Sequence, residues 1–142
     1  MKILVPVDGS AASGRAVRHA IGLVRGRKGA SVFLVNVQNV GALNLGEAAS
    51  VLPPDWLERA VKRASQSALK PAIAACRAAG VAFDAATETG SIAKAVVRVA
   101  LRERADQIVM GTRGLGRIRG LLMGSTATQV VHLAPMPVTL VK

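Results

Sequence analysis

Aromatic residues are nearly absent from this sequence, which has no Tyr, two Phe and one Trp among its 142 residues. Proteins that hold unpaired bases without sequence preference stack them on aromatic side chains. The cations are, in addition, spread over the first three predicted helices. We therefore do not expect nucleic acid as a partner, and we expect Trp56 to serve packing rather than base stacking.

Cysteine and acidic residues are scarce as well. The single cysteine, Cys76, excludes a disulfide within the chain, fits a reducing compartment and is expected to be a small buried residue. Eight Asp and Glu stand against nineteen Lys and Arg, so the formal net charge is +11. This charge favours anionic partners, among them nucleotides, nucleic acid and acidic membrane surfaces, without choosing between them.

The sequence also lacks an uninterrupted hydrophobic run of membrane-spanning length. Residues 29–46 and 120–141 carry no charge, but Asn and Gln interrupt the first run, and Gly, His and Pro interrupt the second. The start of the chain, MKILVPVDGS, has too short an apolar run for a secretion signal. We expect a cytoplasmic protein without membrane contact.

Short apolar runs alternate along the chain with amphipathic helical patterns. Strands are predicted at residues 3–7, 31–37, 81–88, 107–110 and 138–141, and helices at 10–25, 55–79, 91–102 and 125–132. Strands that alternate with helices form a parallel sheet with helices on both faces. The sequence therefore predicts one domain over residues 1–142, an open doubly wound α/β fold whose ligands lie at the carboxyl ends of the strands.

The second predicted helix is the longest. Its apolar residues Leu57, Val61, Ala64 and Ala68 are expected to form the packed face, and Pro71 is expected to bend or break it. The third predicted strand is expected to lie at an edge, with Phe83 and Ala85 covered and Asp84 and Glu88 facing solvent. The long connection at residues 38–53 suggests a functional or mobile segment.

Residues 111–125, GTRGLGRIRGLLMGS, hold five glycines and three arginines and no acid. A phosphate loop of the G-x-x-x-x-G-K-[ST] type is excluded, because Arg117 and Ile118 stand where Lys and Ser or Thr are needed. The dinucleotide pattern G-x-G-x-x-G is excluded as well, because Arg119 replaces the third glycine.

The pattern that remains is G-x-x-G, formed by Gly111 and Gly114, followed after nine residues by Gly124-Ser125. These glycines permit positive φ angles and let backbone N–H groups point at one spot. Gly124 and Ser125 stand where the short last helix begins, a place that attracts anions. Ser125 adds a hydroxyl donor, and Arg113 and Arg117 add positive charge. The loop is therefore predicted to hold a phosphate.

The chain resembles the universal stress protein family. The resemblance is carried by ILVPVDGS near the start, by VFLVNV in the second strand and by residues 111–141 at the end. The spacing of Gly111, Gly114 and Gly124-Ser125, together with Asp8, is similar to the ATP-binding signature of that family. One departure is Asn36, where many members carry His.

The resemblance implies an adenine nucleotide alpha hydrolase-like sheet of strand order 3-2-1-4-5. It also implies homodimers paired through the last strand, Val138, Thr139, Leu140 and Val141, and adenine bound near Pro6, Val7 and Val37. Ribose and phosphates would follow the glycine loop. The predicted nucleotide-binding residues are Pro6, Val7, Asp8, Val37, Met110, Gly111, Arg113, Gly114, Gly116, Arg117, Gly124, Ser125 and Thr126.

ATP is the expected nucleotide, with AMP and ADP as alternatives. Asp8 is expected to hydrogen-bond the nucleotide or to hold Mg²⁺ beside its phosphates, the alternative being that Asp8 only caps the first helix. His19 and His132 have no Cys or acid at ligand spacing, so a metal role is not expected for them.

The function we expect is that of an ATP-binding regulator or sensor in the stress response, with a protein partner still to be identified. No paired carboxylates and no Ser/His/Asp arrangement appear, so efficient catalysis is not expected. Two alternatives stay open. One is a slow ATPase or phosphotransferase, and the other is a protein-interaction module that uses no nucleotide.

Overall fold

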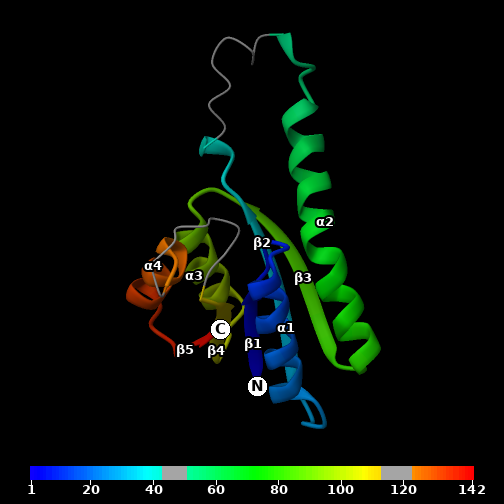
Figure 1. Cartoon of the computed structure of the whole chain (residues 1–142), viewed down its shortest axis with the longest axis vertical. Coiled ribbons are helices and arrows are strands. Elements are labelled where there is room, and N and C mark those ends of the chain that lie inside the picture. The colour runs from blue at the N-terminus through cyan, green and yellow to red at the C-terminus, as the bar shows by residue number, and fades with distance from the viewer. Residues whose placement is uncertain (43–50, 113–122) are drawn as a thin grey trace.

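The computed structural model describes residues 1–42, 51–112 and 123–142. The elements are β1 (Lys2–Pro6), α1 (Ala11–Val24), β2 (Ser31–Gln38), the 3₁₀ turn η1 (Val40–Ala42), α2 (Trp56–Ala79), β3 (Ala82–Thr89), α3 (Ile92–Arg102), β4 (Gln107–Gly111), α4 (Ser125–Leu133) and β5 (Val138–Val141). Each predicted strand and helix is present, with ends that differ by at most one residue (Figure 1).

The sheet has five parallel strands in the order β3-β2-β1-β4-β5, as predicted. β1 lies at its centre, and its residues Ile3, Leu4 and Val5 are fully buried. A parallel strand covered on both faces is apolar along its length, which explains why β1 shows no alternation of apolar and polar residues. From β1 the chain first adds β2 and β3 on one side and then β4 and β5 on the other. The order of strands reverses between β1 and β4, so their carboxyl ends flank the switch point of the fold.

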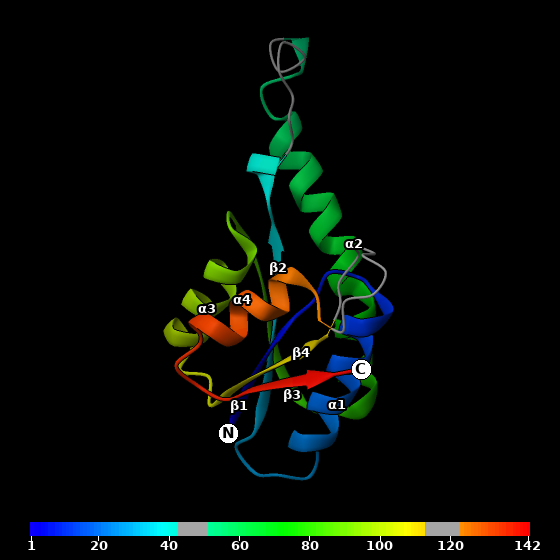
Figure 2. The ribbon, with the colours of Figure 1, turned by 60° about the vertical axis from the view of Figure 1, so that its left-hand side comes forward.

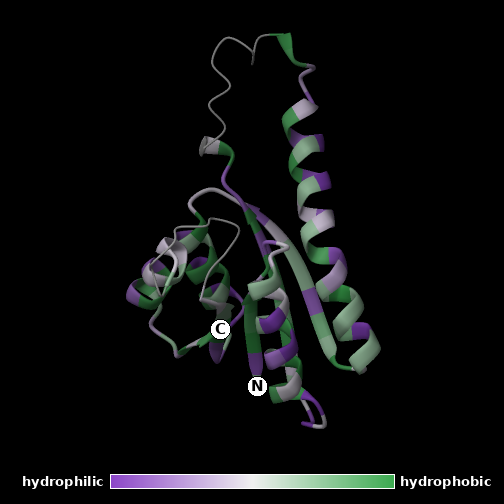
Figure 3. Cartoon of the chain, in the orientation of Figure 1, coloured by the Kyte–Doolittle hydropathy of each residue, from purple (hydrophilic) through white to green (hydrophobic). Residues whose placement is uncertain are grey.

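The helices form two layers around the sheet. α1 and α2 cover one face, where Val5, Val17 and Leu34 belong to one buried cluster. α3 and α4 cover the other face, where Leu4 and Val96 belong to a second cluster. Figure 2 shows the sheet nearly edge-on between these layers, and Figure 3 shows the central strand β1 as largely hydrophobic and α2 as alternating between hydrophobic and hydrophilic residues.

Helix α2 runs without a break through Pro71, but its predicted packed face is wrong in part. Leu57 is 37% exposed and Ala64 is exposed, whereas the buried residues are Ser65, Ala68, Leu69, Ala72 and Cys76. For Leu57 the physical reason is visible in Figure 1, where the start of α2 extends past the end of the sheet. Ala64 is exposed because it lies beside the packed face, next to the buried Ser65. An apolar pattern alone does not show where the supporting sheet stops.

The edge strand β3 also differs from its predicted alternation. Phe83 is half-buried against the α1–α2 side and Ala86 against the α3–α4 side, while Ala85 is exposed. Glu88, predicted to face solvent, is half-buried and paired with arginines of α3. Each face of this edge strand is covered over only part of its length, so no single alternation describes it.

Candidate functional site

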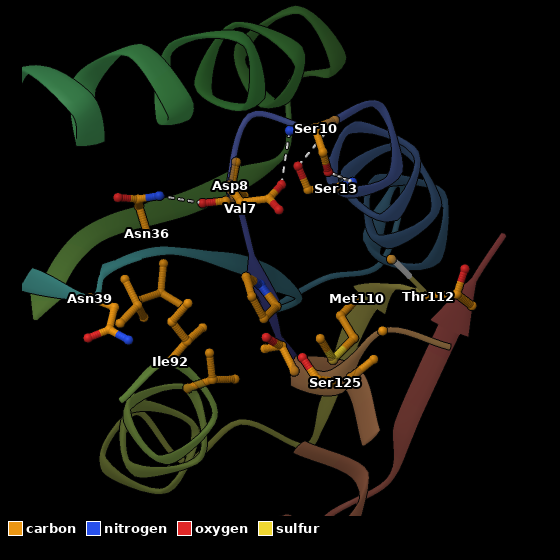
Figure 4. Close-up of a pocket in the computed structure, with 18 of the residues that line it drawn as sticks. Val7, Asp8, Ser10, Ser13, Asn36, Asn39, Ile92, Met110, Thr112 and Ser125 are labelled. Atoms are coloured by element: carbon orange, nitrogen blue, oxygen red, sulfur yellow. Dashed lines mark hydrogen bonds between the residues drawn. The ribbon is translucent and has the colours of Figure 1, made fainter. Parts of the chain in front are cut away.

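A pocket of about 400 Å³ opens at the carboxyl ends of β1, β2 and β4, beside the start of α4. Figure 4 shows its side chains arranged around a central space. The β1–α1 loop and the first turn of α1 supply Asp8, Ser10 and Ser13. Asn39 follows β2, and Ile92 begins α3. Met110 and Thr112 lie at the end of β4, and Ser125 begins α4. The pocket therefore lies at the place where a doubly wound sheet holds its ligand.

The loop between β1 and α1 forms one wall. The Asp8 carboxylate accepts a hydrogen bond from the Ser10 backbone N–H at 2.9 Å, and Gly9 takes a φ of +82°, which suits glycine. The Ser10 hydroxyl accepts from the Ser13 N–H at 3.1 Å, so Ser10 is the N-cap of α1. Ser10 and not Asp8 is therefore the cap of α1, and the Asp8 carboxylate is part of the pocket lining.

A buried amide fixes the second wall. Asn36 is 2% exposed, and its Nδ2 donates to the backbone oxygen of Val7 at 2.6 Å. Its Oδ1 accepts from the Gln38 side chain and from the Ser65 hydroxyl of α2. The Val7 N–H in turn donates to the Val35 oxygen at 2.8 Å. These bonds hold the end of β1, and with it Asp8, against β2 and α2.

The third wall joins β4 to α4. The Gly124 N–H donates to the Thr112 oxygen at 2.7 Å, which brings the start of α4 to the end of β4. A Cβ at Gly111 would lie 2.8 Å from both the carbonyl carbon and the Cβ of Ala12, so close packing of β4 on α1 requires glycine there. Neither described glycine of the loop uses the positive φ that glycine permits: Gly124 has φ −72°, and Gly111 is not among the residues of positive φ.

The start of α4 is open toward the pocket. Gly124 is its N-cap and provides no side-chain cap, and Gly124, Ser125 and Thr126 all line the pocket. The first backbone N–H groups of a helix have no partner within the helix and carry the positive end of its dipole. This end of α4 is therefore suited to an anion such as a phosphate group.

The pocket gathers every predicted binding residue that the structure describes. Those residues are Pro6, Val7, Asp8, Val37, Met110, Gly111, Gly124, Ser125 and Thr126. The other predicted residues, Arg113, Gly114, Gly116 and Arg117, lie outside the described part of the chain. Gly114, the second glycine of the predicted G-x-x-G pattern, is among these residues outside the described part.

Several lining residues were missed by the sequence analysis. Ser13, Ile92 and Val96 fall within the predicted helices at 10–25 and 91–102, and one sequence cannot separate core positions of a helix from pocket positions. Gln38 is the last residue of β2 and Asn39 follows it. Their position at the carboxyl end of a buried strand is a signal that would have found them.

The lining combines apolar side chains such as Val37, Ile92 and Met110 with hydroxyls, amides and the carboxylate of Asp8. Within the described part of the chain, Asp8 is the one acid in this lining, and no cluster of His, Cys, Asp and Glu suited to a metal ion occurs. Cys76 lies outside the pocket, is fully buried, and has its pKa raised by that burial. It is the inert packing residue expected.

The fold and the position of the pocket define a doubly wound α/β protein with a ligand site at its switch point. None of the helices described in residues 1–42, 51–112 and 123–142 is long and apolar enough to cross a membrane.

The sequence profile of the Universal stress protein family matches residues 1–142. A universal stress protein of Thermus aquaticus is 39% identical over 122 residues, which cover 82% of this chain and 89% of that protein. The chain belongs to the universal stress protein family.

Two solved structures of the family are similar to this chain. The universal stress protein from Archaeoglobus fulgidus in complex with dAMP is 25% identical with a TM-score of 0.70, over 100% of this chain and 98% of that one. A universal stress protein in complex with cAMP is 25% identical with a TM-score of 0.66, over 99% and 95% of the two chains. Both of those proteins hold an adenine nucleotide.

Proposed function

We propose that this chain binds an adenine nucleotide, with ATP as the expected one and AMP and ADP as alternatives, in the pocket at the ends of β1, β2 and β4. The observation that carries the proposal is that the uncapped N-terminus of α4 lies at a largely apolar pocket of about 400 Å³. Such a pocket offers cover for a base and a separate place for negative charge. The complexes of two relatives with dAMP and cAMP support it.

In this proposal the adenine lies near Pro6, Val7 and Val37, and the phosphates lie at Gly124, Ser125 and Thr126. The apolar side chains of the lining would take the flat faces of the base, while the first N–H groups of α4 and the Ser125 hydroxyl would donate to phosphate oxygens. Arg113, Gly114, Gly116 and Arg117 would complete the phosphate site from the segment between β4 and α4.

Asp8 would hold Mg²⁺ beside the phosphates. Mg²⁺ is usually bound through one or two carboxylates together with phosphate oxygens and waters. Asp8 supplies such a carboxylate, and the hydroxyls of Ser10 and Ser13 line the same side of the pocket. The donor set therefore fits a cation that neutralises phosphate charge.

We propose a regulatory role rather than efficient catalysis. Rapid hydrolysis of ATP needs a base or water-positioning group as well as a firmly held metal. In the described lining, Asp8 is the one carboxylate and no His is present. Nucleotide occupancy would instead stabilise the chain segments around the pocket, and a partner would recognise that state.

The site assignment is tested by titration calorimetry with ATP and Mg²⁺ on Asp8→Asn and Ser125→Ala. Each change removes one interaction with the triphosphate or its metal, so ATP affinity is expected to fall about 5- to 100-fold. Asp84→Asn and Ser67→Ala are the matched controls, because both residues are exposed and lie outside the pocket. Equal ATP affinities in all four variants would contradict the site.

We also propose that the chain forms a homodimer through β5. This strand is an edge of the sheet, and its residues Val138, Thr139, Leu140 and Val141 are only half-buried. Its outer backbone groups are available to another strand, and pairing with a second copy would cover them. Light scattering on the purified protein should give twice the chain mass of 14.6 kDa. A mass of 14.6 kDa at micromolar concentration would contradict the dimer.

A further inference from the structure

Helix α2 carries its exposed cations on one side. Arg63, Lys70 and Arg77 are exposed, and at about 100° per residue they fall within about 40° of the helix circumference. Lys62, also exposed, flanks them. We call these four residues the basic stripe. It is about 22 Å long, because each residue of an α-helix advances about 1.5 Å along the axis.

The basic stripe carries an excess of positive charge. Arg59, one turn before it, is paired with Asp55 at 3.1 Å, but no residue of the stripe has an ion pair within the described ranges. The sequence contains no Asp or Glu between residues 59 and 83. Cations held in a row without counter-charges produce a positive potential that attracts an extended anion.

Between positions 64 and 78 the exposed surface of α2 around the stripe offers no bulky apolar anchor, and the exposed Leu57 precedes the stripe. The exposed residues between positions 64 and 78 that are not cations are Ala64, Gln66, Ser67, Pro71, Ala74 and Ala78. A protein interface is usually centred on buried aromatic or large side chains. Stable attachment to a membrane surface needs large apolar side chains besides cations. The basic stripe therefore fits neither a protein partner nor a membrane surface.

We propose that the basic stripe binds the phosphate backbone of double-stranded nucleic acid without reading its sequence. A duplex presents a row of phosphates on its outside, and cations on a protein surface bind them without any contact to the bases. The shortage of aromatic residues excludes stacking on unpaired bases, but a duplex backbone requires no stacking. The four cations of the stripe are spread over 16 positions of the sequence, but the periodicity of the helix places them on one side of α2.

This inference is independent of the proposed nucleotide site. No residue of α2 lines the pocket, and the stripe lies on the exposed surface of that helix. Loss of one activity would therefore leave the other in place.

The test uses fluorescence anisotropy with a labelled duplex of about 20 base pairs and arbitrary sequence, titrated at several KCl concentrations. With four phosphate contacts, log Kobs is expected to fall against log[KCl] with a slope of about −3.6, so that affinity drops about 100-fold between 50 and 200 mM KCl. The variant Lys62→Ala/Arg63→Ala/Lys70→Ala/Arg77→Ala should lose nearly all of this binding.

The matched control is Arg18→Ala/Arg25→Ala/Arg27→Ala/Lys28→Ala, which removes the same charge from exposed positions in and after α1. Alanine is favoured in helices, so α2 is expected to fold in the test variant, and circular dichroism checks this. The control should change duplex affinity by less than about 3-fold. Absence of duplex binding, equal losses in both variants, or binding to anionic phosphatidylserine vesicles in place of the duplex would overturn the proposal.

Discussion

Single residues set the shape of the pocket, and Asn36 is the clearest case. Its side chain joins the end of β1 to β2 and α2 through Val7, Gln38 and Ser65. The sequence marked Asn36 only as a departure from the His of many family members. Its structural role is not readable from sequence, because the partners come from three elements that meet only in the folded chain.

Gly111 is a second residue whose role is set by close approach. An alanine there would place its Cβ 2.8 Å from the backbone of Ala12, so β4 and α1 would have to move apart. We expect Gly111→Ala to lower the free energy of unfolding by about 1–3 kcal/mol, the usual cost of overpacking. Urea denaturation measures it.

Gly22 provides the matched control. It lies within α1, and a Cβ there would meet no atom within 4 Å. Gly22→Ala is therefore expected to raise the free energy of unfolding by about 0.5–1 kcal/mol, because alanine is favoured in a helix. If both substitutions shift stability in the same direction, the close contact at Gly111 is not what requires glycine.

At the scale of elements, the boundaries of strands and helices were predictable because Gly, Pro and Ser residues mark their ends. Ser10 caps α1, and Gly80 ends α2 with a φ of +63°. The packed face of α2 was predictable only where the sheet supports it. Leu57 is exposed because the start of the helix extends past the sheet, whereas Ala64 is exposed because it lies beside the packed face, next to the buried Ser65.

The edge strand β3 is tied to α3 by ion pairs that make stability depend on pH. Glu88 accepts from Arg102 Nη1 at 2.7 Å and lies 3.3 Å from Arg98 Nη2. The hydrogen bond from Arg102, with that from Arg98, holds the pKa of Glu88 below the usual value of 4.5. A lowered pKa means that the pair stabilises the fold above pH 4.5 and that this contribution is lost as the pH falls below it.

A double-mutant cycle of Glu88→Gln and Arg102→Ala checks this dependence. The coupling energy between the two sites, from urea unfolding, is expected to be measurable at pH 6 and to disappear toward pH 3. Both side chains are partly exposed, so added salt should reduce the coupling at pH 6. A coupling that stays constant from pH 6 to pH 3 would show that the ionised carboxylate of Glu88 is not its source.

At the scale of the whole molecule, the strand order and the location of the pocket could be predicted because the alternation of strands and helices and the family resemblance restrict the topology. The full set of lining residues could not be predicted, since residues such as Ser13 and Ile92 reach the pocket only through the packing of α1 and α3 on the sheet. The central claim is that the switch point of this fold holds an adenine nucleotide.

The most direct measurement is titration calorimetry of ATP with Mg²⁺ into protein stripped of any co-purified nucleotide, which chromatography of the denatured protein identifies beforehand. The account predicts saturable binding of one ATP per chain and loss of affinity in Asp8→Asn and Ser125→Ala. If the protein releases no adenine nucleotide on denaturation and the stripped protein takes up neither ATP, ADP nor AMP, the pocket is not a nucleotide site and the account is contradicted.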